Sequence, residues 1–182
     1  MRKPKRQINF LTRDEIKEII DTCDKSLIGK RDRALLETLF STGMRIAEAL
    51  AIERRIFDEK PATREMTIIG KGGYQRVIYF SNDALKSILS YLKERVDSKT
   101  PLFPITSRQA QRMVKWRADY AGIRKYVSPH VFRHSLATDL LRQGVDIRIV
   151  SAFLGHRSIS NTMIYTHVVS PQLKKIHEEL YK

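Results

Sequence analysis

Four short segments of the sequence contain arginine, lysine, histidine and tyrosine where a plain helical core would not need them. In chain order they read TGMRIAE, GKGG, HVFRHS and LGHRSISNTMIYTH. Guanidinium groups bind phosphate oxygens bidentately, a lysine can protonate a departing alkoxide, a histidine can move a proton, and a phenol can attack. Together these residue types predict an active site that breaks a phosphodiester without metal ligands.

Each of these residues also has an ordinary structural explanation when it is considered alone. Arg45 and Glu48 stand three positions apart, the spacing of an ion pair on a helix surface that contributes about 0.3 kcal/mol. Lys71 could be a solvated residue of a polar turn, His156 could end a helix, and Tyr165 could be a core residue at helical spacing. The functional interpretation therefore depends on the segments occurring together.

A zinc site is the alternative that the two histidines of HVFRHS leave open. His130 and His134 stand four apart on a predicted helix, which is a spacing that can chelate zinc. The glutamate of an HExxH motif is missing, because Val131 occupies its position. We therefore expect no metal at this site, and we expect His134 to pack within the helix or support the site from behind.

The four segments, in this order, resemble the signature of the tyrosine recombinase family, which includes Xer-type recombinases and phage integrases. The resemblance covers nearly the whole chain. Glu48, three residues after Arg45, matches an acidic position that would hold Arg45 or His130 in place. The catalytic set that the resemblance implies is Arg45, Lys71, His130, Arg133, His156 and Tyr165.

The resemblance implies a transesterification on double-stranded DNA. Tyr165 would attack a phosphorus to give a 3′-phosphotyrosyl bond and a free 5′-hydroxyl, and a hydroxyl from a partner strand would reverse the step. Because bond energy is conserved, no ATP or other cofactor is implied.

The same resemblance gives each of the remaining residues a task. Arg45, Arg133 and His156 would stabilise the negative charge that develops on the phosphoryl oxygens. Lys71 would protonate the departing 5′ oxygen, while His130 would assist removal of the tyrosine proton.

The charge of the chain agrees with a polyanionic partner. The 182 residues include 34 basic and 20 acidic residues, a formal net charge of +14. The basic residues are spread along the chain and no apolar run reaches membrane-spanning length, so we expect no membrane partner. The single cysteine, Cys23, excludes an intrachain disulfide and is expected to be buried. A cytoplasmic, nucleoid-associated location follows.

Hydrophobic periodicity predicts a mainly α protein with a small antiparallel β-sheet, an α+β fold. The strands are expected at Met66–Ile69 and Arg76–Phe80, joined by KGGY as a hairpin. Trp116 is expected to be a partly buried core aromatic, with contact to DNA as the alternative. A capping box of Thr12 and Glu15 predicts the first helix, a second runs from about Lys30 until Gly43, and a third begins near Arg45. Another predicted helix begins at Asn82, with Leu85, Ile88 and Leu89 on one face. The remaining helices are predicted at Ser107–Tyr120, from Pro129 until Gly144, at Ile147–Leu154 and at Ser158–Tyr165.

The predicted organisation is a basic arm over residues 1–11 and one catalytic domain over 12–182. Relatives usually carry a separate helical DNA-binding domain before this one, and we expect none in this chain. The tail helix, residues 170–182, has an apolar stripe of Leu173, Ile176 and Leu180 and is too short to be stable alone. We expect it to dock on a neighbour in a homotetramer on synapsed DNA, with packing on its own domain as the alternative.

The expected function is site-specific DNA recombination, as in integration, excision or dimer resolution. Two other functions remain open at this point. A type IB topoisomerase-like enzyme would use the same nucleophile and arginines to relax DNA as a monomer. A non-enzymatic DNA-binding module would keep the basic charge without forming a covalent adduct.

Overall fold

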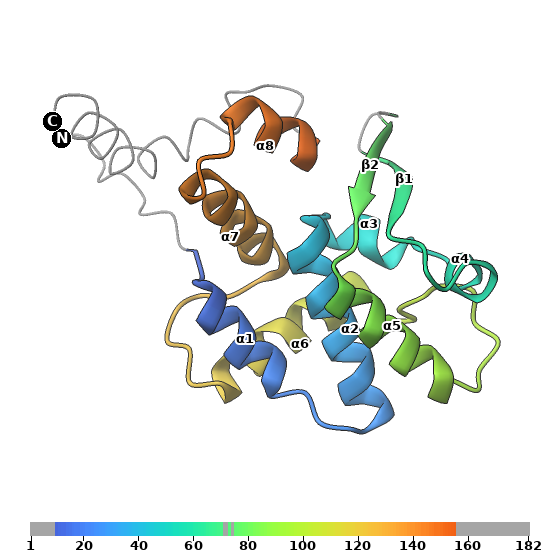
Figure 1. Cartoon of the computed structure of the whole chain (residues 1–182). Helices are drawn as coiled ribbons and strands as arrows, with labels where there is room; N and C mark the ends of the chain where they lie inside the picture. The colour runs from blue at the N-terminus through green and yellow to red at the C-terminus, as the bar shows by residue number, and fades with distance from the viewer. Residues whose placement is uncertain (1–9, 71–72, 74, 156–182) are drawn as a thin grey trace, which may run out of the picture.

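The computed structural model describes residues 10–70, 73 and 75–155. It is mainly helical with one two-stranded antiparallel sheet, which confirms the predicted fold class (Figure 1). The elements are α1 (Arg13–Asp21), α2 (Leu27–Thr42), α3 (Ile46–Leu50), α4 (Arg55–Glu59), β1 (Glu65–Ile69), β2 (Gln75–Tyr79), α5 (Asn82–Glu94), α6 (Ser107–Tyr120), α7 (Pro129–Arg142) and α8 (Ile147–Leu154).

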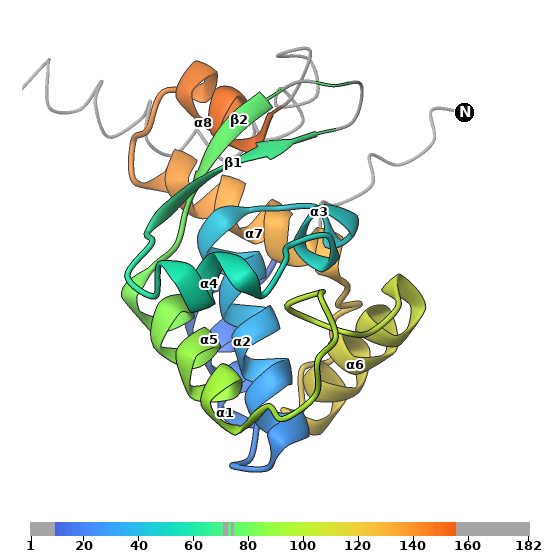
Figure 2. The same ribbon diagram turned by 90° about the vertical axis from the view of Figure 1, so that its right-hand side faces the viewer.

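Helix α2 lies in the middle of the fold, among α1, α5 and α6 (Figure 2). Its side chains Leu35, Leu36 and Leu39 are fully buried and form the centre of the core. The helix ends at Gly43, which has the left-handed φ of +60° that glycine adopts without strain. This turn leads directly into α3, so the end of α2 and the start of α3 are adjacent.

Capping residues account for most of the predicted helix bounds. Thr12 and Glu15 form the expected reciprocal capping box at the start of α1. Helices α6, α7 and α8 begin where the sequence predicted. Helix α2 begins at Leu27 rather than near Lys30, because the Ser26 hydroxyl accepts a hydrogen bond from the backbone N–H of Gly29. The five-residue helix α4 was not predicted.

The hairpin packs one face against the helices. In its register Ile68 lies opposite Arg76, and Ile78 follows two residues later on the same face of β2. Ile68 and Ile78 are buried, whereas Thr67 and Val77 on the other face are exposed. Strand β2 contacts both α2 and α8. Arg76 therefore points toward the interior side of the hairpin.

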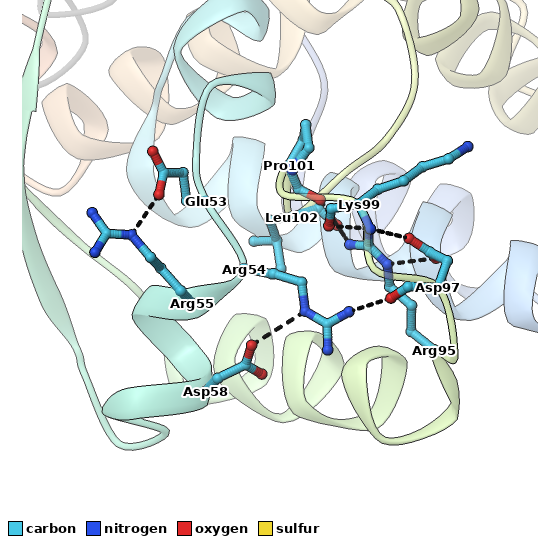
Figure 3. Close-up of polar contacts among 9 residues, drawn as sticks. All are labelled: Glu53, Arg54, Arg55, Asp58, Arg95, Asp97, Lys99, Pro101 and Leu102. Atoms are coloured by element: carbon cyan, nitrogen blue, oxygen red, sulfur yellow. Dashed lines mark hydrogen bonds and ion pairs between the residues drawn. The ribbon is translucent and has the colours of Figure 1, made fainter.

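A buried arginine fixes the loop between α5 and α6. The side chain of Arg95 is 0% exposed and also lies over the ring of Tyr91. Arg54 contacts the same loop, because its Nη1 donates to the Asp97 carbonyl oxygen at 2.6 Å. The Arg95 guanidinium donates hydrogen bonds to the Asp97 carboxylate and to the carbonyl oxygens of Lys99, Pro101 and Leu102 (Figure 3).

The segment that enters α1 is fastened along α7. The backbone N–H of Leu11 donates to Ser135 Oγ at 2.8 Å, and Arg13 forms an ion pair with Asp139 at 2.7 Å. Leu11 is buried, although the sequence placed it in the arm. Residues 1–9 of the predicted arm lie outside the described residues.

Two side chains lie where the sequence did not place them. Trp116 is 54% exposed, so the expectation of a core aromatic was wrong. The buried stripe of α6 passes through Met113 and Arg117 and leaves Trp116 to one side. On α5 Leu89 is exposed, and Tyr91 is buried.

Cys23 is buried as predicted, and desolvation raises the pKa of its thiol to about 11.

Candidate active site

Arg45 occupies the N-cap position of α3, immediately beyond the turn at Gly43. Glu48 Oε2 accepts a hydrogen bond from the Arg45 backbone N–H at 2.8 Å, and Glu48 Oε1 accepts one from Arg45 Nη1 at 3.0 Å. The Arg45 side chain remains 40% exposed, whereas that of Glu48 is only 9% exposed. Glu48 thus holds Arg45 from the inside, which differs from an ion pair on an open helix surface.

Glu48 also binds a second arginine, Arg76, from strand β2. Arg76 Nη2 donates to Glu48 Oε2 at 2.7 Å, and Nη1 donates to Oε1 at 3.2 Å. Burial alone would raise the pKa of Glu48, but the hydrogen bonds and charges of Arg76 and Arg45 lower it to about 2. The carboxylate is therefore ionised across the whole physiological range and joins the hairpin to α3.

Arg133 connects the end of α2 to the end of α8. It lies one turn into α7, is buried, and donates from Nη1 to the Gly43 carbonyl oxygen at 2.5 Å. Its Nη2 donates to the Leu154 carbonyl oxygen at 2.6 Å. These carbonyls end their helices, where carbonyl groups lack helical partners and attract a cation. The contacts fix the guanidinium in one orientation.

His130 begins the same helix and lies in a positive environment. Desolvation, together with the charges of Arg133 and Arg45, lowers the pKa of His130 below its ordinary value. The imidazole is therefore neutral at neutral pH, as a proton acceptor must be. The His134 ring lies edge-on to that of His130, with centroids 4.1 Å apart, which restricts the His130 ring.

The end of α8 is packed closely against the site. A side chain at Gly43 would meet Leu154 Cδ2 at 2.7 Å. At Gly155, which caps α8 with a φ of +66°, a Cβ would lie 2.8 Å from Arg76 Cδ. Two glycines therefore permit the approach of α8 to α2 and to the hairpin.

Three of the predicted catalytic residues, Lys71, His156 and Tyr165, lie outside the described residues, as do the predicted helix Ser158–Tyr165 and the tail. Their chain neighbours are described. Gly70 and Gly73 close the hairpin turn through a hydrogen bond of 3.2 Å.

Within the described part of the chain, the fold brings together Arg45, His130 and Arg133, which come from two helices that are far apart in the sequence. The hairpin, α3 and α8 lie together in the upper half of both views (Figures 1 and 2). Two guanidinium groups close enough to depress a histidine pKa form a site suited to an anion such as a phosphodiester. Within the described ranges, no three histidine, cysteine or acidic side chains are grouped to hold a metal.

Arg76 was not predicted as a residue of the site, although the alternation of residues in its strand indicates an inward-facing arginine. Strand alternation puts Arg76 on the face of Ile78, and a charged side chain on an inward face requires a partner. Glu48 is that partner.

A model of the phage integrase family matches residues 9–171, which include all four motif segments from TGMRIAE to LGHRSISNTMIYTH. The chain belongs to the phage integrase family. The resemblance to tyrosine recombinases and the expected catalytic-domain fold are thereby confirmed. None of the helices within the described part of the chain has the length and apolar character to cross a bilayer.

Curated relatives within the phage integrase family are Xer recombinases. Tyrosine recombinase XerD of Corynebacterium glutamicum is 35% identical over 181 residues, which cover 91% of this chain and 59% of the relative. XerD of Rickettsia bellii is 33% identical, covering 95% and 65%, and tyrosine recombinase XerC of Bacillus pumilus is 32% identical, covering 97% and 62%. The chain spans about three fifths of the length of these relatives.

Solved structures of Xer recombinases share the fold. The XerA recombinase matches with a TM-score of 0.79 and 27% identity, covering 100% of this chain and 66% of that one. The XerH site-specific recombinase, in a post-cleavage complex with its palindromic difH substrate, matches with a TM-score of 0.77 and 25% identity, covering 96% and 54%.

Proposed function

We propose that this chain is the catalytic domain of a site-specific recombinase that cuts and rejoins double-stranded DNA through Tyr165. The observation that carries the proposal is that the charges of Arg133 and Arg45, together with desolvation, act on His130 and lower its pKa. Membership of the phage integrase family and the difH complex of XerH support it. Integration, excision and dimer resolution all use this chemistry.

In the proposed reaction the Tyr165 oxygen forms a bond to phosphorus as the bond from phosphorus to the 5′ oxygen breaks. His130 takes the proton of the phenol, and Lys71 donates one to the departing 5′ oxygen. Arg45, Arg133 and His156 stabilise the charge on the phosphoryl oxygens. The return attack by a 5′-hydroxyl restores the phosphodiester.

A suicide substrate tests the nucleophile directly. The wild-type chain is incubated with nicked, labelled DNA that loses a short fragment on cleavage, and the covalent adduct is resolved on a denaturing gel. Tyr165→Phe is expected to abolish the adduct and to leave DNA binding within about two-fold, because it removes only one oxygen. Tyr79→Phe, at an exposed tyrosine of β2, is the matched control.

The outcomes separate the three functions considered above. Adduct formation by Tyr165→Phe would remove Tyr165 as the nucleophile. Binding without any wild-type adduct would identify a DNA-binding module. Relaxation of supercoiled DNA without strand exchange between two duplexes would identify a topoisomerase-like enzyme.

No cofactor takes part in the proposed reaction, because two arginines and a lysine do the work that a metal would otherwise do. Adduct formation is expected to persist in excess EDTA and without ATP. Loss of cleavage on chelation, with recovery on addition of zinc or magnesium, would contradict this part of the proposal.

The proposed assembly is a homotetramer on two synapsed DNA sites, at the nucleoid, in which residues 170–182 dock on a neighbouring protomer. Deletion from Pro171 onward is expected to weaken synapsis and strand exchange more than the binding of one protomer to one site, as gel-shift and recombination assays can measure. A truncated chain that assembles and recombines normally, or whose monomer unfolds, would contradict the exchange of tails.

A further inference from the structure

Arg76 is held at three points of the site. Its backbone belongs to strand β2, its Nη1 and Nη2 donate to the two carboxylate oxygens of Glu48, and its Cδ, Nε and Nη1 face the position of a Cβ on Gly155 at 2.8–3.2 Å. The side chain is 9% exposed. Arg76 thus joins the hairpin to α3 through the hydrogen bonds to Glu48 and packs against the residue that caps α8.

The geometry of the two hydrogen bonds from Arg76 to Glu48 matters for this attachment. Two parallel hydrogen bonds from one guanidinium to one carboxylate fix both the distance and the relative orientation of the two groups. Glu48 is itself fixed by the Arg45 backbone N–H. The position of β2 relative to α3 is therefore set to within the tolerance of hydrogen bonds, rather than by apolar packing alone.

The sequence puts Lys71 between the strands of this hairpin, two residues after β1 ends and five before Arg76. We propose that Arg76 is a positioning residue that sets the reach of Lys71 toward the departing 5′ oxygen by anchoring β2 to Glu48 and against Gly155. The inference rests on the proposed function, since it gives Arg76 the task of positioning Lys71, the proton donor of that reaction.

A purely structural salt bridge is the competing explanation, because breaking a buried ion pair is destabilising wherever it lies. The two explanations differ in what happens when the leaving group needs no proton. In a 5′-bridging phosphorothiolate substrate, the Tyr165 oxygen bonds to phosphorus while the bond from phosphorus to sulfur breaks, and the sulfur departs as a thiolate. A defect in proton donation disappears on this substrate, whereas a general loss of folded protein does not.

The experiment compares wild type, Arg76→Lys, Lys71→Ala and the double variant by single-turnover adduct formation on the two substrates. Arg76→Lys keeps the charge beside Glu48 and loses the fork. On the ordinary phosphodiester it is expected to slow cleavage by about 100-fold, the usual result of misplacing a catalytic group by about 1 Å. On the phosphorothiolate both single variants should return to within about three-fold of wild type. In the double variant, Arg76→Lys should add little to Lys71→Ala.

Arg64→Lys, at an exposed arginine just before β1, is the matched control and should cleave like wild type. Circular dichroism at the assay temperature verifies that each variant is folded. A defect of equal size on both substrates, additive effects with Lys71→Ala, or a wild-type rate for Arg76→Lys would each overturn the proposal. Absence of a wild-type adduct on either substrate would instead count against the proposed function.

Discussion

Arg133 donates a hydrogen bond of 2.6 Å to the carbonyl oxygen of Leu154, the last residue of α8. This contact ties the exit of α8 to the helix that carries both His130 and Arg133. His156 lies two residues after Leu154 in the sequence. The buried guanidinium of Arg133 therefore has a structural task and a proposed catalytic task. Arg45, whose side chain is 40% exposed, has a smaller structural task.

Alanine substitution should separate these tasks. Arg45→Ala and Arg133→Ala are each expected to slow adduct formation by about 100-fold or more, because each removes a charged contact to the transition state. Arg133→Ala should also lower the free energy of unfolding by about 3 kcal/mol, since it leaves buried carbonyl groups unpaired. Arg45→Ala should cost less than about 1 kcal/mol, because its side chain is 40% exposed.

Single-turnover cleavage and urea denaturation measure the two quantities separately. Arg45→Lys serves as the charge-preserving control and should recover little activity, because an ammonium cannot reproduce the guanidinium fork. Equal stability of Arg133→Ala and wild type would mean that the contacts to Gly43 and Leu154 contribute nothing to folding.

The titration of His130 should respond to its cationic neighbours. Its pKa is lowered by desolvation and by the charges of Arg133 and Arg45, so Arg45→Ala is expected to raise it toward the ordinary value. NMR titration of the histidine ring protons measures this shift without any need for activity. Arg64→Ala is the control for a general change in charge. A His130 pKa that is unchanged in Arg45→Ala would show that the two groups do not interact.

The pKa of Glu48 gives the stability of the fold a defined pH dependence. Its value of about 2 in the folded protein lies below the ordinary 4.5. The unfolded chain therefore binds more protons between these values, and the stabilisation that Glu48 provides is complete above pH 4.5 and is lost as the pH falls toward 2.

Glu48→Gln removes this titration. The variant should be less stable than wild type at neutral pH, and the difference should shrink as the pH falls through that window. Urea denaturation across the window measures it, with Glu18→Gln, at an exposed position of α1, as the control. A difference in stability that stays constant with pH would contradict the assignment.

The loop fixed by Arg95 should matter for stability and not for chemistry. Arg95→Met leaves the buried carbonyl oxygens of the loop unpaired and is expected to lower the free energy of unfolding by about 3 kcal/mol. Arg55→Met, at an ion pair whose arginine is 69% exposed, should leave it nearly unchanged, because solvent screens an exposed ion pair. Both variants should form the DNA adduct at the wild-type rate at a temperature where they remain folded.

Local signals were sufficient for most of the fold. Caps such as Thr12 and Gly43, and apolar residues at helical spacing, predicted the helices because both act within a few residues of the chain. Helix α4 escaped detection because five residues hold too little periodicity. Its stability comes instead from contacts with distant residues, such as that of Arg54 with Asp97.

The sequence indicated residues of the site but not the contacts between them. Motif order indicated Arg45, Glu48, His130 and Arg133, and the structure brings these four together. The sharing of Glu48 between two arginines depends on a hairpin that returns to α3 across 28 positions, which no local pattern encodes. Trp116 was misplaced for a similar reason, since the buried pairing of Arg117 with Asp32 determines which face of α6 turns inward.

The attachment of Leu11 to Ser135 and of Arg13 to Asp139 also has a mechanical consequence. Tension applied to the chain before Phe10 is transmitted through these contacts to α7, as well as along the chain to α1. Helix α7 carries His130 and Arg133 in its first two turns. A tether on this side of the molecule would therefore pull on the helix that carries two of the proposed catalytic residues, and a pulling experiment should disturb the site before it disrupts the packing of α2 on α5.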